Sequence, residues 1–157
     1  MRQVGHAIAT ALSTILLAGC AARDASDPVR LRELATQYTA AWSSQDPASV
    51  AAFFAEDGSL RINDAAPSVG RPAITAAAQG FMDAIPDLAL EMDSLNVNGN
   101  QAVYAWTLTG TNTGPGGTGR PIRISGYEEW TIGADGLIAA SLGHFDEAEY
   151  KRQLLGD

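Results

Sequence analysis

The sequence predicts an α+β domain in which three N-terminal helices pack on a curved antiparallel sheet and enclose a pocket. The first observation is a change of period. Apolar residues recur at helical spacing through residues 28–85 and at every second position from residue 88 onward. The second observation is a pair of strong hairpin signals, Asn98-Gly99 and Asp135-Gly136, in the region of period two. Helices followed by hairpins indicate a meander with its helices on one face.

The helical region divides into three segments. Asp27 and Pro28 supply a cap and a first-turn proline, and an apolar stripe follows over residues 31–42. A second, short helix is expected over residues 48–54, and a third over residues 71–85. The periodicity therefore predicts one long helix and two shorter ones before the sheet.

The rest of the chain is expected to form the sheet. Four strands are predicted from the alternation of apolar and polar residues, over 88–97, 102–111, 121–132 and 137–145. Asp57-Gly58 reads as the end of the second helix, and residues 60–63 are expected to add a short edge strand.

The alternation within residues 121–132 separates the two faces of that strand. One face is apolar apart from a single acid and carries Ile122, Ile124, Gly126, Glu128, Trp130 and Ile132. The other face is mostly polar and carries Arg123, Ser125, Tyr127, Glu129 and Thr131. The apolar face must point at the helices, so Glu128 is expected inside the pocket.

The last strand is expected to repeat this pattern. Its predicted inward face carries Ile138, Ala140, Leu142, His144 and Asp146. Phe145, on the opposite face, competes for the interior, and the alternative for Asp146 is a position beyond the end of the strand. A three-residue hairpin loop at 134–136 places Gly126 opposite His144, and Glu128 and His144 are then diagonal neighbours within side-chain reach. A two-residue loop would shift the register by one residue and separate them.

The catalytic candidates are these three ionisable groups, Glu128, His144 and Asp146. Buried carboxylates and imidazoles cost free energy unless they are paired, so their clustering on an apolar face indicates a site that could hold a general acid and a general base. We expect burial to raise the pKa of Glu128. The alternative is a structural network of Glu–His and carboxylate-to-backbone bonds at the open end of the sheet.

A ligand pocket is expected beside these groups. Its predicted lining is Phe81, Trp106, Gly126 and Trp130. Gly126 offers no side chain and so leaves room for a ligand, whereas the aromatic residues could equally serve as core.

The N-terminal residues resemble a bacterial lipoprotein signal. Arg2 supplies a positive start, and residues 7–18 form an apolar run that is too short to span a bilayer as a helix. The run ends in Leu-Ala-Gly before Cys20, like a lipobox, in which the cysteine carries the lipid and becomes the first mature residue. This predicts a signal peptide over 1–19, a lipidated Cys20 with a tether to residue 27, and an exported domain over 28–157. An ordinary secretory signal is the alternative.

The composition of the chain limits the kinds of molecule that we expect the protein to bind. The 157 residues carry a formal net charge of −8 and include a single cysteine, Cys20. We therefore expect no internal disulfide, no nucleic-acid partner and contact with a membrane only through the anchor. We also expect no metal and no cofactor, and a small apolar molecule as the ligand.

Several short motifs lie at residues 86–88 (PDL), 103–106 (VYAW), 110–114 (GTNTG), 118–121 (TGRP) and 135–138 (DGLI). Together they resemble the SnoaL-like polyketide cyclases of the wider nuclear transport factor 2-like (NTF2-like) superfamily. The resemblance covers about residues 30–155. It implies a cone-shaped α+β fold with a deep pocket, often dimerised through the outer sheet face, here around Tyr127 and Arg123.

The resemblance also implies a chemistry. The cyclases use an aspartate at the end of the last strand as general acid and base, without a cofactor, and the matching residue is Asp146. The chain departs from the family at Ile132, where the cyclases have a helper histidine. Two hypotheses follow: a lipid-anchored domain that binds an apolar ligand, with weak acid–base activity at most, or a cofactor-independent cyclase or isomerase acting on a carbonyl compound through Asp146.

Overall fold

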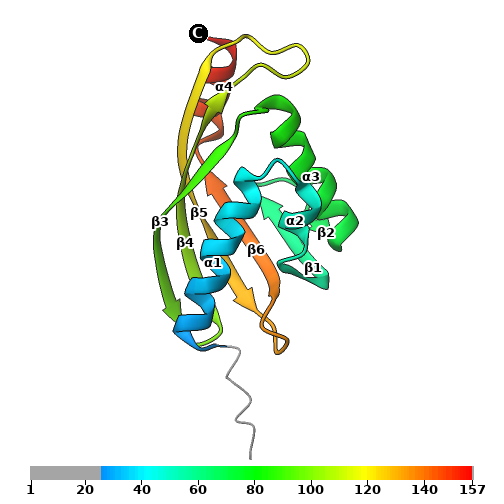
Figure 1. Cartoon of the computed structure of the whole chain (residues 1–157), viewed down its shortest axis with the longest axis vertical. Helices are drawn as coiled ribbons and strands as arrows, with labels where there is room; N and C mark the ends of the chain where they lie inside the picture. The colour runs from blue at the N-terminus through cyan, green and yellow to red at the C-terminus, as the bar shows by residue number, and fades with distance from the viewer. Residues whose placement is uncertain (1–25, 157) are drawn as a thin grey trace, which may run out of the picture.

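The structure is a computed structural model that describes residues 26–156. Six strands form one curved, unclosed sheet in the order β2-β1-β6-β5-β4-β3, and the first three helices lie on its inner side (Figure 1). The elements are α1 (Pro28–Ser43), α2 (Pro47–Ala51), β1 (Phe54–Ile62), β2 (Ser68–Val69), α3 (Arg71–Ala84), β3 (Ala89–Asn98), β4 (Gln101–Thr111), β5 (Pro121–Ile132), β6 (Ile138–Phe145) and α4 (Glu147–Leu155). The predicted α+β class with its N-terminal helices is confirmed.

The long helix α1 forms as its cap and its apolar stripe predict. The Asp27 side chain accepts a hydrogen bond from the backbone N–H of Val29 at 2.9 Å, and Pro28 occupies the first turn. Its buried residues recur at helical spacing: Leu31, Ala35, Tyr38, Ala41 and Trp42. This stripe packs against the sheet, and the charged side chains of α1 face solvent.

The two shorter helices hold the other end of the inner face. α2 ends at Ala51, earlier than predicted, because Phe54 already belongs to a strand. α3 buries Ile74, Ala78 and Met82, which lie at every fourth position on one side of the helix. The Arg71 side chain at its start donates from Nε to the carbonyl of Phe54 at 2.9 Å and ties α3 to the first strand.

The strand β1 differs from its prediction in length and place. The sequence predicts an edge strand over 60–63, but β1 has nine residues and lies inside the sheet between β2 and β6. Gly58, expected to end a helix, lies within β1 near a register shift, where a Cβ atom would come 2.8 Å from the carbonyl oxygen of Ile138. β1 runs parallel to β6, which the predicted antiparallel sheet did not include, whereas β3 to β6 pair antiparallel as predicted. β1 also pairs antiparallel with β2, a strand that was not predicted.

The four long strands β3 to β6 form the predicted meander. β3 and β4 join through a tight turn in which Gly99 has a φ of 58°, a conformation that glycine adopts without strain. Across β4 and β5, Tyr104 pairs with Glu128 and Trp106 with Gly126, so these four residues share the inner face. The alternation predicted for β5 is confirmed, because Ile122, Ile124, Glu128, Trp130 and Ile132 are all buried.

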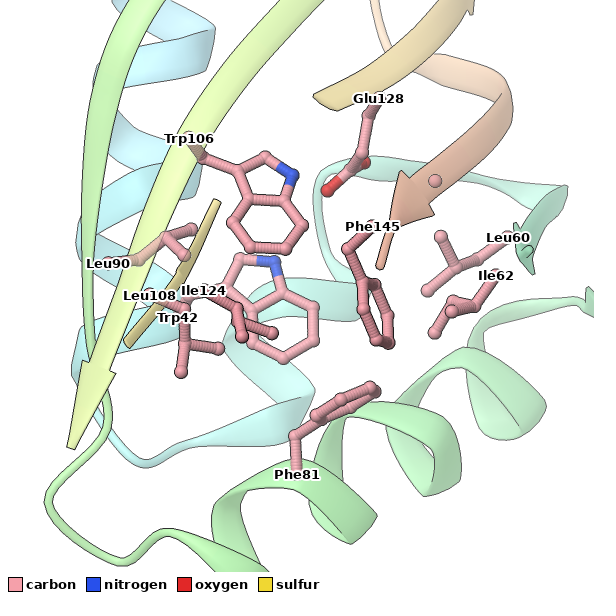
Figure 2. Close-up of a pocket in the computed structure, with 11 residues that line it drawn as sticks. Trp42, Leu60, Ile62, Phe81, Leu90, Trp106, Leu108, Ile124, Glu128 and Phe145 are labelled. Carbon is pink, nitrogen blue, oxygen red and sulfur yellow. The ribbon is translucent and has the colours of Figure 1, made fainter. Parts of the chain in front are cut away.

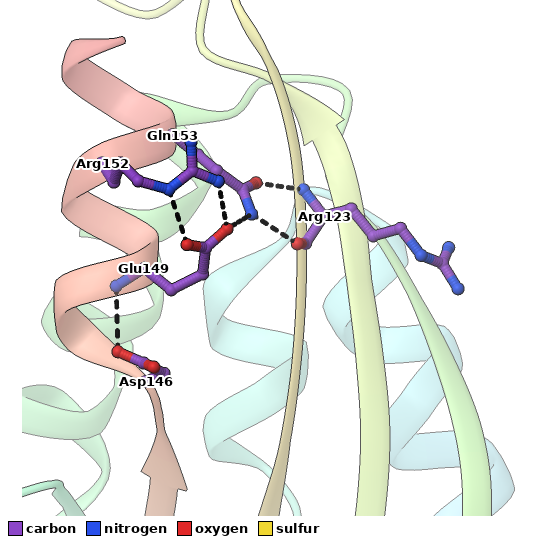
Figure 3. Close-up of polar contacts among 5 residues, drawn as sticks. All are labelled: Arg123, Asp146, Glu149, Arg152 and Gln153. Carbon is purple, nitrogen blue, oxygen red and sulfur yellow. Dashed lines mark hydrogen bonds and ion pairs between the residues drawn. The ribbon is translucent and has the colours of Figure 1, made fainter. Parts of the chain in front are cut away.

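A fourth helix, which the sequence analysis did not include, follows β6. The Asp146 side chain caps it by accepting from the backbone N–H of Glu149 at 2.9 Å. The side-chain amide of Gln153 accepts from the backbone N–H of Arg123 at 2.7 Å and donates to the carbonyl of Arg123 at 2.9 Å (Figure 3). β6 ends opposite Gly126, so the backbone of β5 has no neighbouring strand on this side at Arg123. The side chain of Gln153 supplies the hydrogen-bond partners that a strand would otherwise give.

Within residues 26–156, no helix is long and apolar enough to cross a membrane. The predicted signal peptide and the predicted lipidation site, Cys20, lie outside the described residues. The membrane anchor therefore stays a prediction.

The packing over Gly126 generates a first prediction. A Cβ atom there would lie 2.4 Å from the carbonyl oxygen of His144 and 2.6 Å from Cζ2 of Trp106. Gly126→Ala should therefore lower the free energy of unfolding by about 1–3 kcal/mol, as overpacking does. Urea denaturation measures this change. The control is Gly80→Ala on the exposed side of α3, where a Cβ meets nothing within 4 Å and should add about 0.5–1 kcal/mol. An unchanged urea midpoint for Gly126→Ala would contradict the packing described.

Candidate functional site

A narrow cavity lies between the inner face of the sheet, α1 and α3 (Figure 2). The space open to a water-sized sphere is about 40 Å³, where a single water needs roughly 10–15 Å³. Its lining is apolar apart from one acid and consists of Trp42, Leu60, Ile62, Phe81, Leu90, Trp106, Leu108, Ile124, Glu128, Gly143 and Phe145. The cavity is apolar, but its volume is well below the roughly 150 Å³ of a cavity that holds benzene, so a molecule the size of one ring requires the lining side chains to move.

The carboxyl group of Glu128 is bound by donors from three elements. Its Oε2 accepts from Oγ of Ser141 on β6 at 2.6 Å, from Nε1 of Trp130 on β5 at 2.8 Å and from the hydroxyl of Tyr38 on α1 at 3.1 Å. Its Oε1 accepts only a longer bond from the Tyr38 hydroxyl, at 3.2 Å. Among the described residues, Oε2 thus has its full set of partners, whereas Oε1 keeps free hydrogen-bonding capacity.

The pKa values in this network shift because it is buried. Burial raises the pKa of Glu128 above its ordinary value, although the hydrogen bonds from Ser141, Trp130 and Tyr38 oppose the shift. Burial, with the nearby charge of Glu128, also raises the pKa of Tyr38 well above its ordinary value. The raised pKa predicted for Glu128 is confirmed. Tyr38 therefore keeps its proton, and Glu128 is the group of the two that can exchange a proton at a pH below the ordinary pKa of tyrosine.

A second tyrosine supports the network from β4. The hydroxyl of Thr39 donates to the carbonyl of Ala35 at 2.8 Å, so the Tyr104 hydroxyl must be the donor in its 2.7 Å bond to Thr39. Burial raises the pKa of Tyr104, and its ring stacks on that of Trp130 with 4.7 Å between centroids. Tyr104 therefore remains a neutral donor and fixes the indole that binds Glu128.

The predicted pocket residues are placed in two layers. Phe81 and Trp106 line the cavity (Figure 2). Gly126 lies under the Trp106 ring, where it allows the indole to lie close to the sheet, and Trp130 is fully buried behind Glu128. Phe81, Trp106 and Glu128 thus face the space in which a ligand would bind, whereas Gly126 and Trp130 support it.

His144 does not point into the cavity. Ile132 pairs with Ile138 but Thr131 pairs with Ala140, so Ala139 is an extra residue in β6. This bulge moves every later side chain of β6 to the opposite face. His144 therefore lies opposite Tyr127 on the outer face and stacks on its ring, with 4.7 Å between centroids. The predicted inward position of His144 and its contact with Glu128 are wrong.

The same bulge changes the other residues of β6. Ser141, Gly143 and Phe145 face inward instead of Leu142 and His144. Asp146 lies beyond the strand, is exposed and does not line the cavity, because its side chain caps α4. The structure therefore does not bring Glu128, His144 and Asp146 together, and no finding tests a catalytic role for any of them.

The outer face of the sheet carries the predicted dimer surface. Val103 on β4 and Tyr127 on β5 are each 40% exposed there, and Tyr127 stacks on His144. Pairing of two copies through this face stays a prediction. No three His, Cys, Asp or Glu side chains gather among residues 26–156 as a metal site would require.

Three residues of the site were not identified as such from the sequence. Tyr38 and Trp42 lie on the apolar stripe of α1 and read as core, although Tyr38 binds Glu128 and Trp42 lines the cavity. Ser141 is fully buried and gives Glu128 its shortest bond, but the register predicted without the bulge places it outside. A polar residue in the middle of a largely apolar strand was the available signal for Ser141.

Comparisons with known proteins agree with this geometry. Residues 35–141 match the family model of the SnoaL-like domain. TsrD from Streptomyces laurentii is 27% identical with a TM-score of 0.71, and the match covers 82% of this chain and 96% of TsrD. Among curated proteins, none matches the chain.

Two further solved structures show the fold. A protein of ketosteroid isomerase-like fold from Catenulispora acidiphila, solved with trimethylamine, is 17% identical with a TM-score of 0.70, over 78% of this chain and 92% of its own. An NTF2-like protein from Burkholderia pseudomallei is 20% identical with a TM-score of 0.69, over 80% and 97% respectively. Both share the curved sheet with its helices on one side, and at these identities they establish the fold alone.

The raised pKa of Glu128 predicts a pH-dependent cost of folding. The folded protein holds this proton more tightly than the unfolded chain, whose carboxyl has its ordinary pKa of 4.5. The contribution of Glu128 to the free energy of unfolding should therefore fall as the pH rises above that value. Glu128→Gln keeps the acceptor and cannot ionise, so its stability relative to wild type should increase from pH 4 to pH 8 in urea denaturation.

Glu129→Gln is the matched control for that experiment. Glu129 is the next residue along β5 and is exposed on the outer face. This substitution removes the same charge without changing the buried network, so its stability relative to wild type should stay nearly constant with pH. A constant difference for Glu128→Gln as well would show that the buried carboxyl does not change its proton affinity on folding.

Proposed function

Because the chain belongs to the SnoaL-like domain family, we propose that its pocket binds a small, largely apolar molecule. The observation that carries the proposal is the cavity wall, which is apolar except for Glu128. Moving apolar surface from water into such a wall is favourable by about 25 cal/mol per Å². Because the lining includes no Lys, Arg or His, a charged partner for an anionic ligand is missing there.

An aromatic cluster beside the cavity would serve as its entrance. Phe81 on α3, Phe145 at the end of β6 and Tyr150 on α4 are partly exposed and contact one another, with 6.4 Å between the rings of Phe81 and Phe145 and 5.6 Å between those of Phe145 and Tyr150. Two of these side chains come from the C-terminal segment that follows the bulge. Rotation of these rings would admit a ligand without opening the sheet.

Glu128 is the residue to which we assign weak acid–base activity in this pocket. Its carboxyl borders the cavity, and burial shifts its pKa toward the range that a general acid needs. Asp146, the residue matched to the cyclase aspartate, is exposed and occupied in capping α4. The geometry therefore favours a binding domain over a cyclase or isomerase that works through Asp146.

The location of the domain is also a proposal. The apolar segment over 7–18 and the small residues before Cys20 support export and attachment of a lipid at that cysteine. The domain would then face the outside of a bacterial cell membrane, to which its anchor holds it. An apolar ligand that partitions into the bilayer would reach the pocket from a short distance.

Filling the cavity tests the binding proposal. A Cβ atom on Gly143 would meet only ordinary contacts, the nearest at 3.5 Å from the carbonyl oxygen of Arg61. Gly143→Val should therefore place its methyl groups in the cavity and raise the Kd for toluene, measured by calorimetry, by about tenfold or more. The stability of the variant should be unchanged or higher, because a cavity is filled.

Gly143→Ala is the control for that experiment, since its single methyl group reaches less of the cavity. It should keep most of the toluene affinity. Undiminished binding by Gly143→Val would place the toluene elsewhere and contradict the proposed pocket.

Removing the thiol tests the anchor. Cys20→Ala should move the protein from the membrane fraction to the soluble exported fraction, while its thermal denaturation stays that of the wild-type domain. Thr14→Ala, in the same N-terminal region but without loss of the thiol, should stay membrane-bound. Intact-mass analysis of wild type that found an unmodified Cys20 with residues 1–19 still attached would rule the anchor out.

A further inference from the structure

The cavity contains indole N–H groups that bind nothing in the protein. The chain has three tryptophans. The Nε1 of Trp130 donates to Glu128 at 2.8 Å. The Nε1 atoms of Trp106 and Trp42 are buried and make no hydrogen bond, although both residues line the cavity and are 8% and 7% exposed. A buried donor without a partner costs stability, so such groups require an explanation.

Of the two indole N–H groups that make no hydrogen bond within residues 26–156, that of Trp106 is the one more clearly available to a ligand. The Trp42 indole lies close enough to the Tyr38 hydroxyl to lower its pKa, whereas no described group interacts with the Trp106 N–H. Its ring is held over Gly126, where even a methyl group would collide with it, so the indole has little freedom to turn away. Figure 2 shows its nitrogen directed toward the Glu128 carboxyl, with which it makes no hydrogen bond.

Glu128 leaves this donor unsatisfied, although one of its two oxygen atoms keeps free hydrogen-bonding capacity. The Oε2 atom is occupied by Ser141, Trp130 and Tyr38. The Oε1 atom has only the long bond to Tyr38. A ligand atom placed in the cavity could therefore contact the Trp106 N–H and lie beside the free side of the Glu128 carboxyl.

We propose that the pocket recognises an apolar molecule through one neutral oxygen acceptor, which accepts a hydrogen bond from Nε1–H of Trp106. This inference rests on the proposed function, because it names the chemical class of the ligand that the same cavity binds. An indole N–H can only donate, so its partner must be an acceptor. A carboxylate ligand would find no cation among the lining residues, and an ammonium group would not satisfy the indole donor.

The test uses three ring compounds of the same shape: cyclohexanone, its hydrocarbon analogue methylenecyclohexane, and cyclohexylamine. The purified protein is labelled with ¹⁵N at its tryptophan indoles, and each compound is titrated while the three N–H signals are followed by NMR. We expect cyclohexanone to bind about tenfold more tightly than methylenecyclohexane and to shift the Trp106 signal downfield. The Trp130 signal, already hydrogen-bonded to Glu128, is the internal reference.

Two variants locate the donor. Trp106→Phe keeps an aromatic ring and removes the N–H, so it should bind cyclohexanone and methylenecyclohexane with nearly equal affinity. Trp42→Phe changes the lining and removes the other free N–H, so it should alter the affinity for both compounds but keep their ratio in favour of the ketone. If Trp106→Phe does not fold, the shift of the wild-type Trp106 signal by the ketone alone still decides the question.

The outcomes separate this inference from the proposed function. Equal binding of the ketone and the hydrocarbon, with no shift of the Trp106 signal, would overturn the inference and leave apolar binding standing. Tighter binding of cyclohexylamine, or loss of the ketone preference in Trp42→Phe alone, would also overturn it. Failure of all three compounds to bind, together with failure of toluene, would overturn the proposed function itself.

Discussion

The bond network around the carboxyl group of Glu128 joins the helical layer of this protein to its sheet. It connects Tyr38 on α1, Trp130 on β5 and Ser141 on β6. Tyr38 is fully buried, and its ring contacts five other aromatic rings, those of Trp42, Phe53, Phe54, Tyr104 and Trp130. Loss of the carboxyl would leave three buried donors unsatisfied, at about 1–3 kcal/mol each, so the placement of the aromatic core depends on this acid.

The same side chain borders the cavity, and this joins stability to function. An apolar wall makes a charged carboxylate costly, and the three donors offset only part of that cost, as the raised pKa of Glu128 indicates. Because Glu128 contributes both to the stability of the fold and to the lining of the cavity, a substitution of this residue that improves ligand binding would also change the stability of the protein. The side chains of Leu60 and Ile124, which also line the cavity, take no part in this bond network.

Periodicity predicts much of the fold and part of the site. The stripe of α1 and the alternation of β5 depend on local geometry, so they correctly place the helix and the inward position of Glu128. The register of β6 depends on one extra residue, Ala139. Because this residue is an alanine and not a glycine, a proline or a polar residue, the sequence gives no sign of a bulge there. His144 and Asp146 were therefore misplaced and Ser141 was missed. The contact between Tyr38 and Glu128 spans 90 residues, and no local pattern predicts it.

The parallel pairing of β1 with β6 sets the order in which the molecule can fold. β1 is the first strand to be synthesised, yet its central neighbour is the last, so that roughly 80 residues of intervening chain must be closed into a loop before the two can pair. Such a high contact order slows folding. Until β6 is synthesised, the edge of β1 that pairs with β6 has unpaired backbone groups that a neighbouring chain could bind, so the nascent protein is open to aggregation.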